Sequence, residues 1–241
     1  MHSIATIQAV QGRIDKAAIR FGKSADAVRL LAVSKGQSVT AIQQAIRYGL
    51  RCFGENQVQE ALDKIKHIGH EAPDHTPIEW HFIGSIQSNK TRQIAEHFDW
   101  VHGIAREKDA QRLNGQRPSH LAALNSLIQI NVSAEASKSG VNTDQVLTLA
   151  RCITDLPHLR FRGLMGIPAP SNDFNEQRRQ LRVLSDLFNT LKTKGHSIDT
   201  LSMGMSSDLE AAIAEGATMV RIGSALFGPR NQPSIHIHPD E

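Results

Sequence analysis

The sequence is poor in the features that mark several large classes of protein. Its two cysteines, Cys52 and Cys152, lie 100 positions apart, and no CxxC or Cys/His metal-ligand spacing occurs. This argues against a disulfide framework or a zinc fold and favours a reducing compartment, so we expect a cytoplasmic protein. No apolar run approaches the ~18–20 residues of a membrane-spanning helix. Residues 1–20 have neither a continuous apolar stretch nor a cleavage signature, and we expect no secretory signal there.

No charge of one sign dominates the chain. The 27 Lys and Arg residues exceed the 24 Asp and Glu residues, giving a net charge of +3 and an isoelectric point near 9.0. Because the basic residues are dispersed, this balance suits a small anionic ligand and does not call for nucleic acid. Hydrophobic residues make up 40% of the chain, which is enough for a folded core and excludes wholesale disorder. We expect no nucleic-acid partner and no membrane partner.

Short apolar runs alternate with helical patterns along most of the chain. Apolar residues at steps of three and four predict an amphipathic helix over residues 3–22. Eight candidate strands follow, at residues 29–35, 51–56, 79–85, 100–104, 126–133, 161–168, 199–204 and 219–228. Apolar strands separated by helices indicate a parallel sheet covered by helices, and eight such units favour an α/β fold, a closed (β/α)8 TIM barrel with an extra N-terminal helix.

We expect a single domain, with the barrel over about residues 29–229 and a tail over residues 230–241. The alternative fold is an open, doubly wound sheet. It is disfavoured because no GxGxxG follows the first strand, whereas a dinucleotide-binding sheet usually carries one there.

A lysine closes the first predicted strand. Barrels bind ligands at the carboxyl ends of their strands, and Lys35 shares a strand face with Leu31 and Val33 by the period of two. Desolvation there lowers the pKa of an ammonium group and frees the amine to attack carbonyls, although a single lysine at a strand end more often points into solvent. Lys90, at the start of a helical run, and Lys138, in a predicted loop, are rival nucleophiles.

Small and polar residues close the last two predicted strands. Ser-Met-Gly-Met-Ser-Ser-Asp occupies residues 202–208, and Gly-Ser occupies residues 223–224. Glycine, serine and a helix N-terminus offer backbone N–H groups to an anion. Arg221 adds a fixed positive charge on the face of Gly223, where the backbone can approach a ligand closely. The pattern indicates an anion site, and a plain capped helix start is the alternative interpretation.

A nucleophilic lysine at one side of a barrel mouth and an anion cradle opposite it together indicate pyridoxal 5′-phosphate (PLP), held as a Schiff base. The same parts would suit a Schiff-base aldolase acting on a phosphorylated sugar. That enzyme needs an acid or base beside the lysine, and the carboxylates near strand ends, Glu55 and Glu79, show no evident pairing with it.

Several long motifs resemble a known family, the pyridoxal phosphate homeostasis proteins. They cover most of the chain: LLAVSK (30–35), FGENQVQE (53–60), WHFIGSIQSNK (80–90), IQINVSAEASKSG (128–140), GLMGIPAP (163–170) and LSMGMSSDLEAAIAEGATMVRIGSALFG (201–228). The resemblance implies a barrel like the N-terminal domain of alanine racemase, with PLP joined to Lys35 as an internal aldimine.

The same resemblance implies the other cofactor contacts. Asn56 and Arg221 would lie close to PLP, with Arg221 facing either the pyridine nitrogen or the phosphate. Phosphate contacts, mostly through backbone amides, would come from Ser202, Met203, Gly204, Ser206, Gly223 and Ser224. Two departures stand out, because the family often has Lys-Thr-x-Pro where this chain has Lys-Gly-Gln-Ser (35–38), and Asn-Tyr where it has Asn-Gln (56–57). Gly36 is expected to loosen the turn after Lys35.

Catalysis is less expected than cofactor carriage. Racemisation needs a base on each face of the substrate α-carbon, and in racemases resembling this fold the second base is a tyrosine from a further domain of a partner subunit. The single tyrosine, Tyr48, lies in a helical run, and residues 230–241 are too few for another domain. We expect a non-catalytic PLP homeostasis protein, a monomer or weak homodimer, that buffers PLP and supplies it to apo-enzymes. A PLP-dependent amino-acid racemase or other small aldimine enzyme, and a purely protein-binding module, are the alternatives.

Overall fold

Eight parallel strands form a closed barrel in the computed structural model of the chain, in the order β1 to β8. The structure describes residues 4–132 and 139–228. Parts of the expectations lie outside these residues, namely residue 3 of the first helix, residue 133 of the fifth strand, Lys138, and residues 229–241. The strands are β1 (Arg29–Val33), β2 (Cys52–Glu55), β3 (Glu79–Phe82), β4 (Trp100–Ile104), β5 (Leu124–Ile130), β6 (Leu159–Gly166), β7 (Thr200–Ser202) and β8 (Met219–Ile222).

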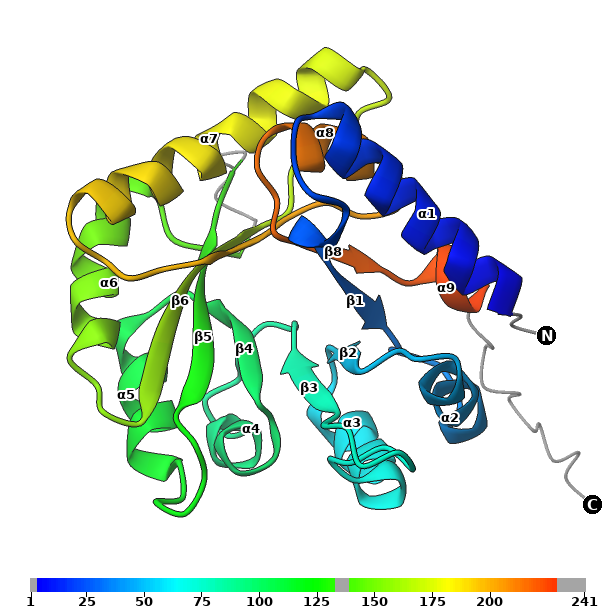
Figure 1. Cartoon of the computed structure of the whole chain (residues 1–241). Helices are drawn as coiled ribbons and strands as arrows, with labels where there is room; N and C mark the ends of the chain where they lie inside the picture. The colour runs from blue at the N-terminus through cyan, green and yellow to red at the C-terminus, as the bar shows by residue number, and fades with distance from the viewer. Residues whose placement is uncertain (1–3, 133–138, 229–241) are drawn as a thin grey trace, which may run out of the picture.

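Helices follow the strands and surround the ring that they form (Figure 1). They are α1 (Ile4–Arg20), α2 (Val39–Arg47), α3 (Val58–Ile68), α4 (Thr91–His97), α5 (Glu107–Gln116), α6 (Val146–Thr154), α7 (Phe174–Thr193), α8 (Leu209–Ala214) and α9 (Ser224–Phe227), with 3-10 turns at Ala25–Ala27 and Thr143–Gln145. This confirms the predicted (β/α)8 barrel with an extra N-terminal helix. None of the helices in the described part of the chain is long and apolar enough to cross a membrane.

The extra helix α1 packs on the outside of the barrel. Its apolar stripe, which includes Ile7, Val10 and Ile14, is buried, because residues three or four apart share one helix face. Figure 1 shows α1 beside α8 and α9, the last two helices of the described chain. Arg13 of α1 adds an ion pair with Glu210 of α8 at 2.6 Å.

Alternation along each strand separates an apolar outer core from a mixed interior. On β3, Trp80 and Phe82 are buried in the large core cluster between strands and helices, while His81, one position away, is buried and contacts His102 on β4. Successive strand residues point to opposite faces. Trp100, together with Leu127 and Met165, forms a separate small apolar cluster. The barrel interior is therefore mixed, with the buried His81 and His102 beside this apolar cluster.

Barrel closure brings the last strand beside the first. Leu31 of β1 pairs with Arg221 of β8, and β8 ends at Ile222, so that the end of the predicted strand 219–228 is instead the short helix α9. The segment after β8 therefore lies next to the end of β1, and the segment after β7 follows one strand further round the ring. This corrects the expectation of an anion cradle opposite Lys35, because a closed ring makes neighbours of elements at the two ends of the barrel sequence.

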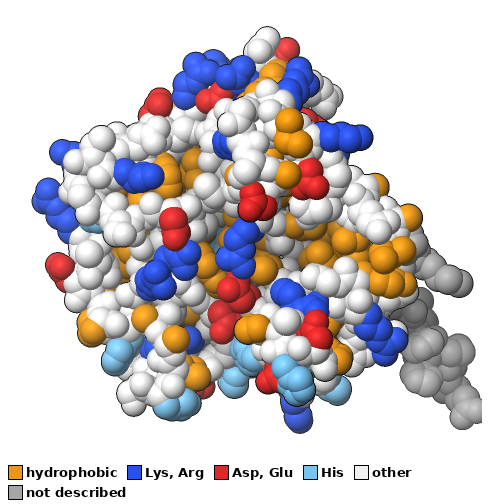
Figure 2. Space-filling view, in the orientation of Figure 1, with side chains coloured by type: hydrophobic (Ala, Val, Ile, Leu, Met, Phe, Trp, Pro, Cys, Tyr) orange, Lys and Arg blue, Asp and Glu red, His pale blue; other side chains and the backbone are white. Residues whose placement is uncertain are grey.

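Charged side chains do not gather by sign on the visible face. Figure 2 shows Lys and Arg side chains interspersed with Asp and Glu side chains. Many of the charges pair, as in Arg162 with Asp199 at 2.7 Å and Arg178 with Glu215 at 2.6 Å. On this face, the dispersed charge predicted from the sequence is therefore also dispersed in space.

Candidate functional site

A cavity of about 1000 Å³ opens at the carboxyl ends of the strands. Six residues predicted as ligand contacts line it: Lys35, Asn56, Ser206, Arg221, Gly223 and Ser224. They come from β1, β2, β7 and β8, or from the segments directly after these strands, which lie side by side in the closed ring. Gln129, Asn131 and Ser139 add polar groups from the region of β5.

Three other predicted contacts lie beneath this lining. Ser202 is fully buried, and its hydroxyl accepts a hydrogen bond from Arg221 Nη1 at 2.9 Å. Met203 is in the apolar core, and its backbone N–H already donates to the Met219 carbonyl at 3.1 Å. Gly204 has a φ of +95°, and a Cβ there would lie 2.5 Å from the Cβ of Ala212. Glycine at this position allows α8 to pack against the turn that shapes the cavity.

Arg221 is a buried cation with a fixed position. Its Nη1 donates to the Ser202 carbonyl at 2.6 Å and to the Ser202 hydroxyl, and its Nη2 donates to the Gly166 carbonyl at 2.9 Å. Burial lowers the pKa of Arg221 to about 10, and Asp208 opposes this shift, so the guanidinium remains charged at neutral pH. Since these bonds tie it to the ends of β6 and β7, it offers the cavity a positive charge that needs no rearrangement.

Asp208 is the acidic group of the cavity lining. Its Oδ1 accepts the Met205 N–H at 2.7 Å, while Oδ2 is buried without a hydrogen-bond partner among the described residues. Burial raises the pKa of Asp208, against the bond from Met205 and the charge of Arg221. The carboxyl shapes the turn before α8 and leaves one polar atom unpaired.

The backbone on both sides of Lys35 is held by side chains of α3. Lys64 Nζ donates to the Ser34 carbonyl at 2.8 Å, and Glu60 Oε1 accepts the Gly36 N–H at 2.6 Å. Gly36 has a φ of +71°, which glycine adopts at little cost. The turn that Gly36 was expected to loosen is therefore tied to α3 on each side of Lys35, which is itself half-buried.

We call the contacts of Lys64 and Glu60 with the backbone beside Lys35 the clamp. An ion cluster that was not predicted from the sequence lies at its centre. Lys64 Nζ lies 2.7 Å from Glu55 Oε1 and 2.6 Å from Glu60 Oε1, and Ser34 Oγ donates to Glu55 Oε1 at 2.5 Å. Burial raises the pKa of Glu55, and Lys64 and Ser34 oppose that rise. The only available signal was the four-residue spacing of Glu60 and Lys64, which puts both on one helix face. Glu55, a candidate acid or base, thus pairs with Lys64.

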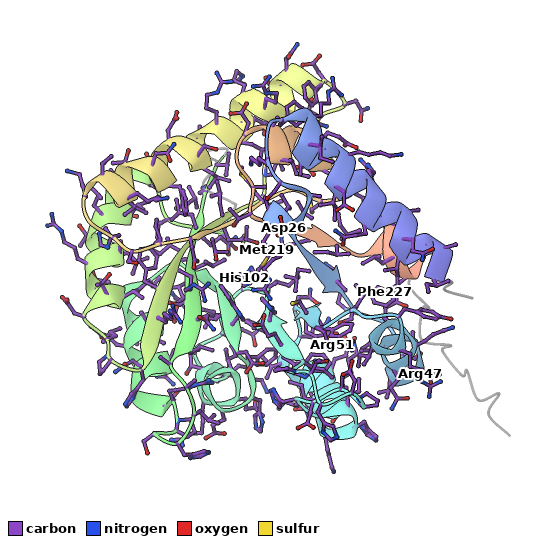
Figure 3. The ribbon with its side chains drawn as sticks, viewed as in Figure 1. Asp26, Arg47, Arg51, His102, Met219 and Phe227 are labelled. Carbon is purple, nitrogen blue, oxygen red and sulfur yellow. The ribbon has the colours of Figure 1, made fainter. Side chains whose placement is uncertain are left out.

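A second buried chain of polar groups runs from Arg221 through the barrel interior. Ser202 Oγ lies 3.2 Å from His102 Nδ1, His102 Nε2 lies 3.0 Å from His81 Nδ1, and His81 Nε2 lies 3.3 Å from Glu79 Oε2. Figure 3 shows His102 inside the ring of strands. We call this chain, from Arg221 to Glu79, the interior relay. It extends from the cavity to the opposite end of the barrel, where Glu79 opens β3.

The charges at the two ends of the interior relay determine which group donates each hydrogen bond along it. Burial raises the pKa of Glu79, but the His81 hydrogen bond and the Arg29 charge outweigh it and lower that pKa to about 2. Burial lowers the pKa of His81 and of His102, so both rings are neutral. An ionised Glu79 requires the His81 Nε2–H as donor, which makes His81 Nδ1 the acceptor of the His102 Nε2–H. His102 Nδ1 then accepts from the Ser202 hydroxyl.

Other predicted reactive groups lie away from the cavity lining. Tyr48 caps the C-terminus of α2, directly after Arg47, and its hydroxyl accepts a hydrogen bond from Gln44 Nε2 at 3.2 Å. Lys90 precedes α4. Neither residue is among those that line the cavity, and Lys138 lies outside the described residues. Of the three lysines considered as nucleophiles, Lys35 is the one that the structure places in the lining.

The fold and this site define a barrel of the alanine racemase type, and the alanine racemase N-terminal domain family matches residues 7–231. The pyridoxal phosphate homeostasis protein of Escherichia coli K12 is 53% identical over 92% of this chain and 94% of its own length. That of Vibrio alginolyticus is 55% identical over 87% of this chain and 90% of its own length. The chain therefore belongs to the family of pyridoxal phosphate homeostasis proteins.

A solved structure agrees in fold over almost the whole described chain. PipY of Synechococcus elongatus, determined with PLP bound, matches with a TM-score of 0.80 and 30% identity, covering 93% of this chain and 99% of that one. The resemblance seen in the sequence motifs and the comparison of whole structures thus point to the same family.

Proposed function

We propose that this chain binds PLP through the Lys35 amine and holds it reversibly, for supply to apo-enzymes in the cytoplasm. The observation that carries the proposal is that Lys35, the Arg221 cation and the segments after β7 and β8 line one cavity. The family relation supports it, as does the PLP bound by PipY.

The donor set fits the chemical groups of PLP. Its phosphate suits the segment around Ser206 and the start of α9, because the first N–H groups of a helix have no acceptor within it. Barrels often use a short helix after the eighth strand for this purpose. Gly223 lets the end of β8 lie close to β1, since a Cβ there would lie 3.3 Å from the Val33 carbonyl oxygen. When bound, PLP supplies an aldehyde that condenses reversibly with amines, and in this proposal Lys35 is the amine that holds it.

Arg221 and Asn56 complete the proposed site. Arg221 would sit against either the pyridine nitrogen or the phosphate. At the nitrogen, a guanidinium would keep the ring unprotonated and so make it a poorer electron sink. The bonds from Arg221 to Ser202 and Gly166 hold the guanidinium in place for either role. In the first role it would favour storage of the cofactor over carbanion chemistry.

The position of Tyr48 supports carriage over racemisation. A second base is needed on the far face of a substrate carbon, and the hydroxyl of this tyrosine lies at the end of α2, within hydrogen-bond distance of Gln44. A monomer or weak homodimer suffices for the proposed role, because Lys35 and the proposed anion-binding segments all come from one chain.

Borohydride trapping tests the proposed attachment. The parent protein incubated with PLP is expected to show an absorbance band that borohydride fixes covalently, with the label on the peptide that contains Lys35. Lys35→Ala should lose both the band and the label, whereas Lys90→Ala, outside the cavity, should keep them. A label of equal yield in Lys35→Ala would overturn the assignment.

A solvent-exchange experiment separates carriage from turnover. The PLP-loaded protein is incubated with L-alanine or L-serine in D2O, and α-deuteration and the D-enantiomer are measured. We expect no incorporation beyond that of free PLP at the same concentration. Deuteration with repeated turnover per protein would favour an amino-acid racemase or a related enzyme instead.

A further inference from the structure

A cluster of metal-ligand side chains lies at the end of the barrel interior opposite the cavity. Cys52 begins β2 and Glu79 begins β3, and the two residues are paired in the sheet register. His81 follows Glu79 by two positions, so it lies on the same face of β3. One ligand atom from each of the three lies within 4.8 Å of the others. Strand pairing thus unites ligands that show no metal spacing in the sequence.

Two of the three separations within this cluster match those of ligands on one ion. Cys52 Sγ lies 3.6 Å from Glu79 Oε2, which lies 3.3 Å from His81 Nε2. Tetrahedral zinc with bonds of about 2.3 Å to sulfur and about 2.0–2.2 Å to nitrogen and oxygen separates S from O by about 3.6 Å and O from N by about 3.3 Å. A hydrogen bond to a charged group is shorter, at about 2.7–2.9 Å.

A cation already contacts two of the three ligand residues. Arg29 Nη2 lies 2.6 Å from Glu79 Oε2 and 2.9 Å from Cys52 Sγ. The Arg29 side chain is 44% exposed, so it can turn outward without unpacking the barrel. His81, by contrast, is fully buried, and the pairing of β2 with β3 fixes the backbone of all three ligands.

We propose that Cys52, Glu79 and His81 form a binding site for one zinc-class divalent cation, which displaces the Arg29 guanidinium. A thiolate, an imidazole nitrogen and a carboxylate oxygen are the donors that zinc prefers, and water would complete four-coordination. Binding transfers the Cys52 proton to solvent and forms the sulfur–metal bond. Burial raises the pKa of the Cys52 thiol to about 11, so the metal competes with this proton.

Metal binding would also reverse the interior relay. A metal on His81 Nε2 requires a lone pair there, so the ring proton of His81 moves to Nδ1 and is donated to His102 Nε2. The ring proton of His102 then resides on Nδ1 and faces Ser202 Oγ, which turns its own proton elsewhere. Both rings stay neutral, and the change reaches the residue that holds Arg221.

Cobalt(II) provides a spectroscopic probe for this site in the full-length protein. We expect one equivalent of Co²⁺ to produce a thiolate-to-metal charge-transfer band, and Zn²⁺ to displace it stoichiometrically. Cys52→Ser should abolish the band and weaken binding by at least the ~10-fold that loss of even an outer-shell partner costs. Cys152→Ser, which alters the other cysteine, is the matched control and should leave the band intact.

Two further variants distinguish a built site from chance binding by surface histidines. Arg29→Gln removes the competing cation and should tighten Co²⁺ binding by about fivefold, in line with the loss of one exposed ion pair. Glu79→Gln should weaken it. Binding that is unchanged in Cys52→Ser, or weaker in Arg29→Gln, would overturn the proposal. Thermal melting checks that each variant is folded, and Cys52→Ser is close to isosteric.

Discussion

The two ends of the barrel interior are built from the same strands and differ in what closes them. At the carboxyl ends, Lys35 and Arg221 face a cavity of about 1000 Å³. At the amino ends, side chains fill the space, and Trp100 has Arg162 over its ring at 4.7 Å and Arg29 at 6.0 Å. Loops after the strands can be shaped around a ligand, whereas residues that open the strands pack against one another.

The two ends also differ in how their arginine side chains are neutralised. Carboxylates pair with the arginines at the amino ends, whereas the charge of Arg221 at the carboxyl ends is available to a ligand. Near the cavity, Arg221 donates to two carbonyl oxygens and a hydroxyl, which are neutral acceptors, and Asp208 lowers the net positive charge only in part. At the other end, Arg29 and Arg162 are paired with Glu79 and Asp199. The cavity therefore keeps the positive character that an anionic cofactor requires.

The largest expected effect comes from breaking the clamp beside the cavity. Lys64→Met removes the cation between Glu55 and Glu60 and leaves the buried Glu55 carboxylate without a counter-ion. We expect the free energy of unfolding to fall by about 3–5 kcal/mol, and PLP occupancy to fall because the backbone at Ser34 and Gly36 loses its anchors. Denaturant unfolding and the absorbance of the PLP-loaded protein measure the two effects.

Lys66→Met is the matched control for this variant. Lys66 lies on the same helix, α3, but is exposed, so its replacement should change stability by less than about 0.5 kcal/mol. If Lys64→Met is no more harmful than Lys66→Met, the clamp does not stabilise the cavity side of the barrel. Restoring stability with the double variant Lys64→Met/Glu55→Gln would show that unpaired charge is the cause.

A smaller effect is expected at the turn after β7. Gly204→Ala places a Cβ 2.5 Å from Ala212 at a φ of +95°, while Gly216→Ala has a similar φ of +99° but its nearest neighbour lies at 3.8 Å. Both variants carry the same backbone strain, so their difference isolates the clash. We expect Gly204→Ala to be less stable than Gly216→Ala by about 1–3 kcal/mol in denaturant unfolding. Equal losses would mean that α8 moves freely against the turn.

The sequence allowed the cavity side to be predicted in outline because strand ends can be located from local patterns. Lys35 and Arg221 are placed near strand ends by a period of two and by the common polarity of parallel strands, whereas Asn56 was implied as a cofactor contact by the family resemblance. Ring closure was harder, because the pairing of Leu31 with Arg221 joins residues far apart in the chain. Because the sequence presents the strands in linear order, the anion-binding segments were predicted opposite Lys35, whereas ring closure brings β8 beside β1.

The interior relay and the Cys52 cluster could not be predicted for a related reason. Their contacts join strands whose relative register is set by the barrel, so that His102 meets Ser202 across 100 positions of sequence. The alternation of side chains along β3 shows which residues share a face, but it does not show whether the face of His81 is inside or outside the barrel. Part of the clamp was predictable from the sequence, because Lys64 follows Glu60 by four positions on one helix. The contact between Lys64 and Glu55 was not, because it depends on how α3 packs against β2.

The relay that connects the two ends is expected to make stability depend on pH. His102 is neutral in the folded protein because burial lowers its pKa, while the unfolded chain takes up a proton below about pH 6.5. Stability is therefore retained above that pH and lost as the pH falls below it, by at most about 1.4 kcal/mol per pH unit for each such histidine. His102→Gln, which can still donate and accept, should flatten this dependence in unfolding curves between pH 7 and pH 5. His97→Gln, at the exposed end of α4, should leave it unchanged, and an unaltered slope in His102→Gln would mean that the burial of neutral His102 does not cause the pH dependence.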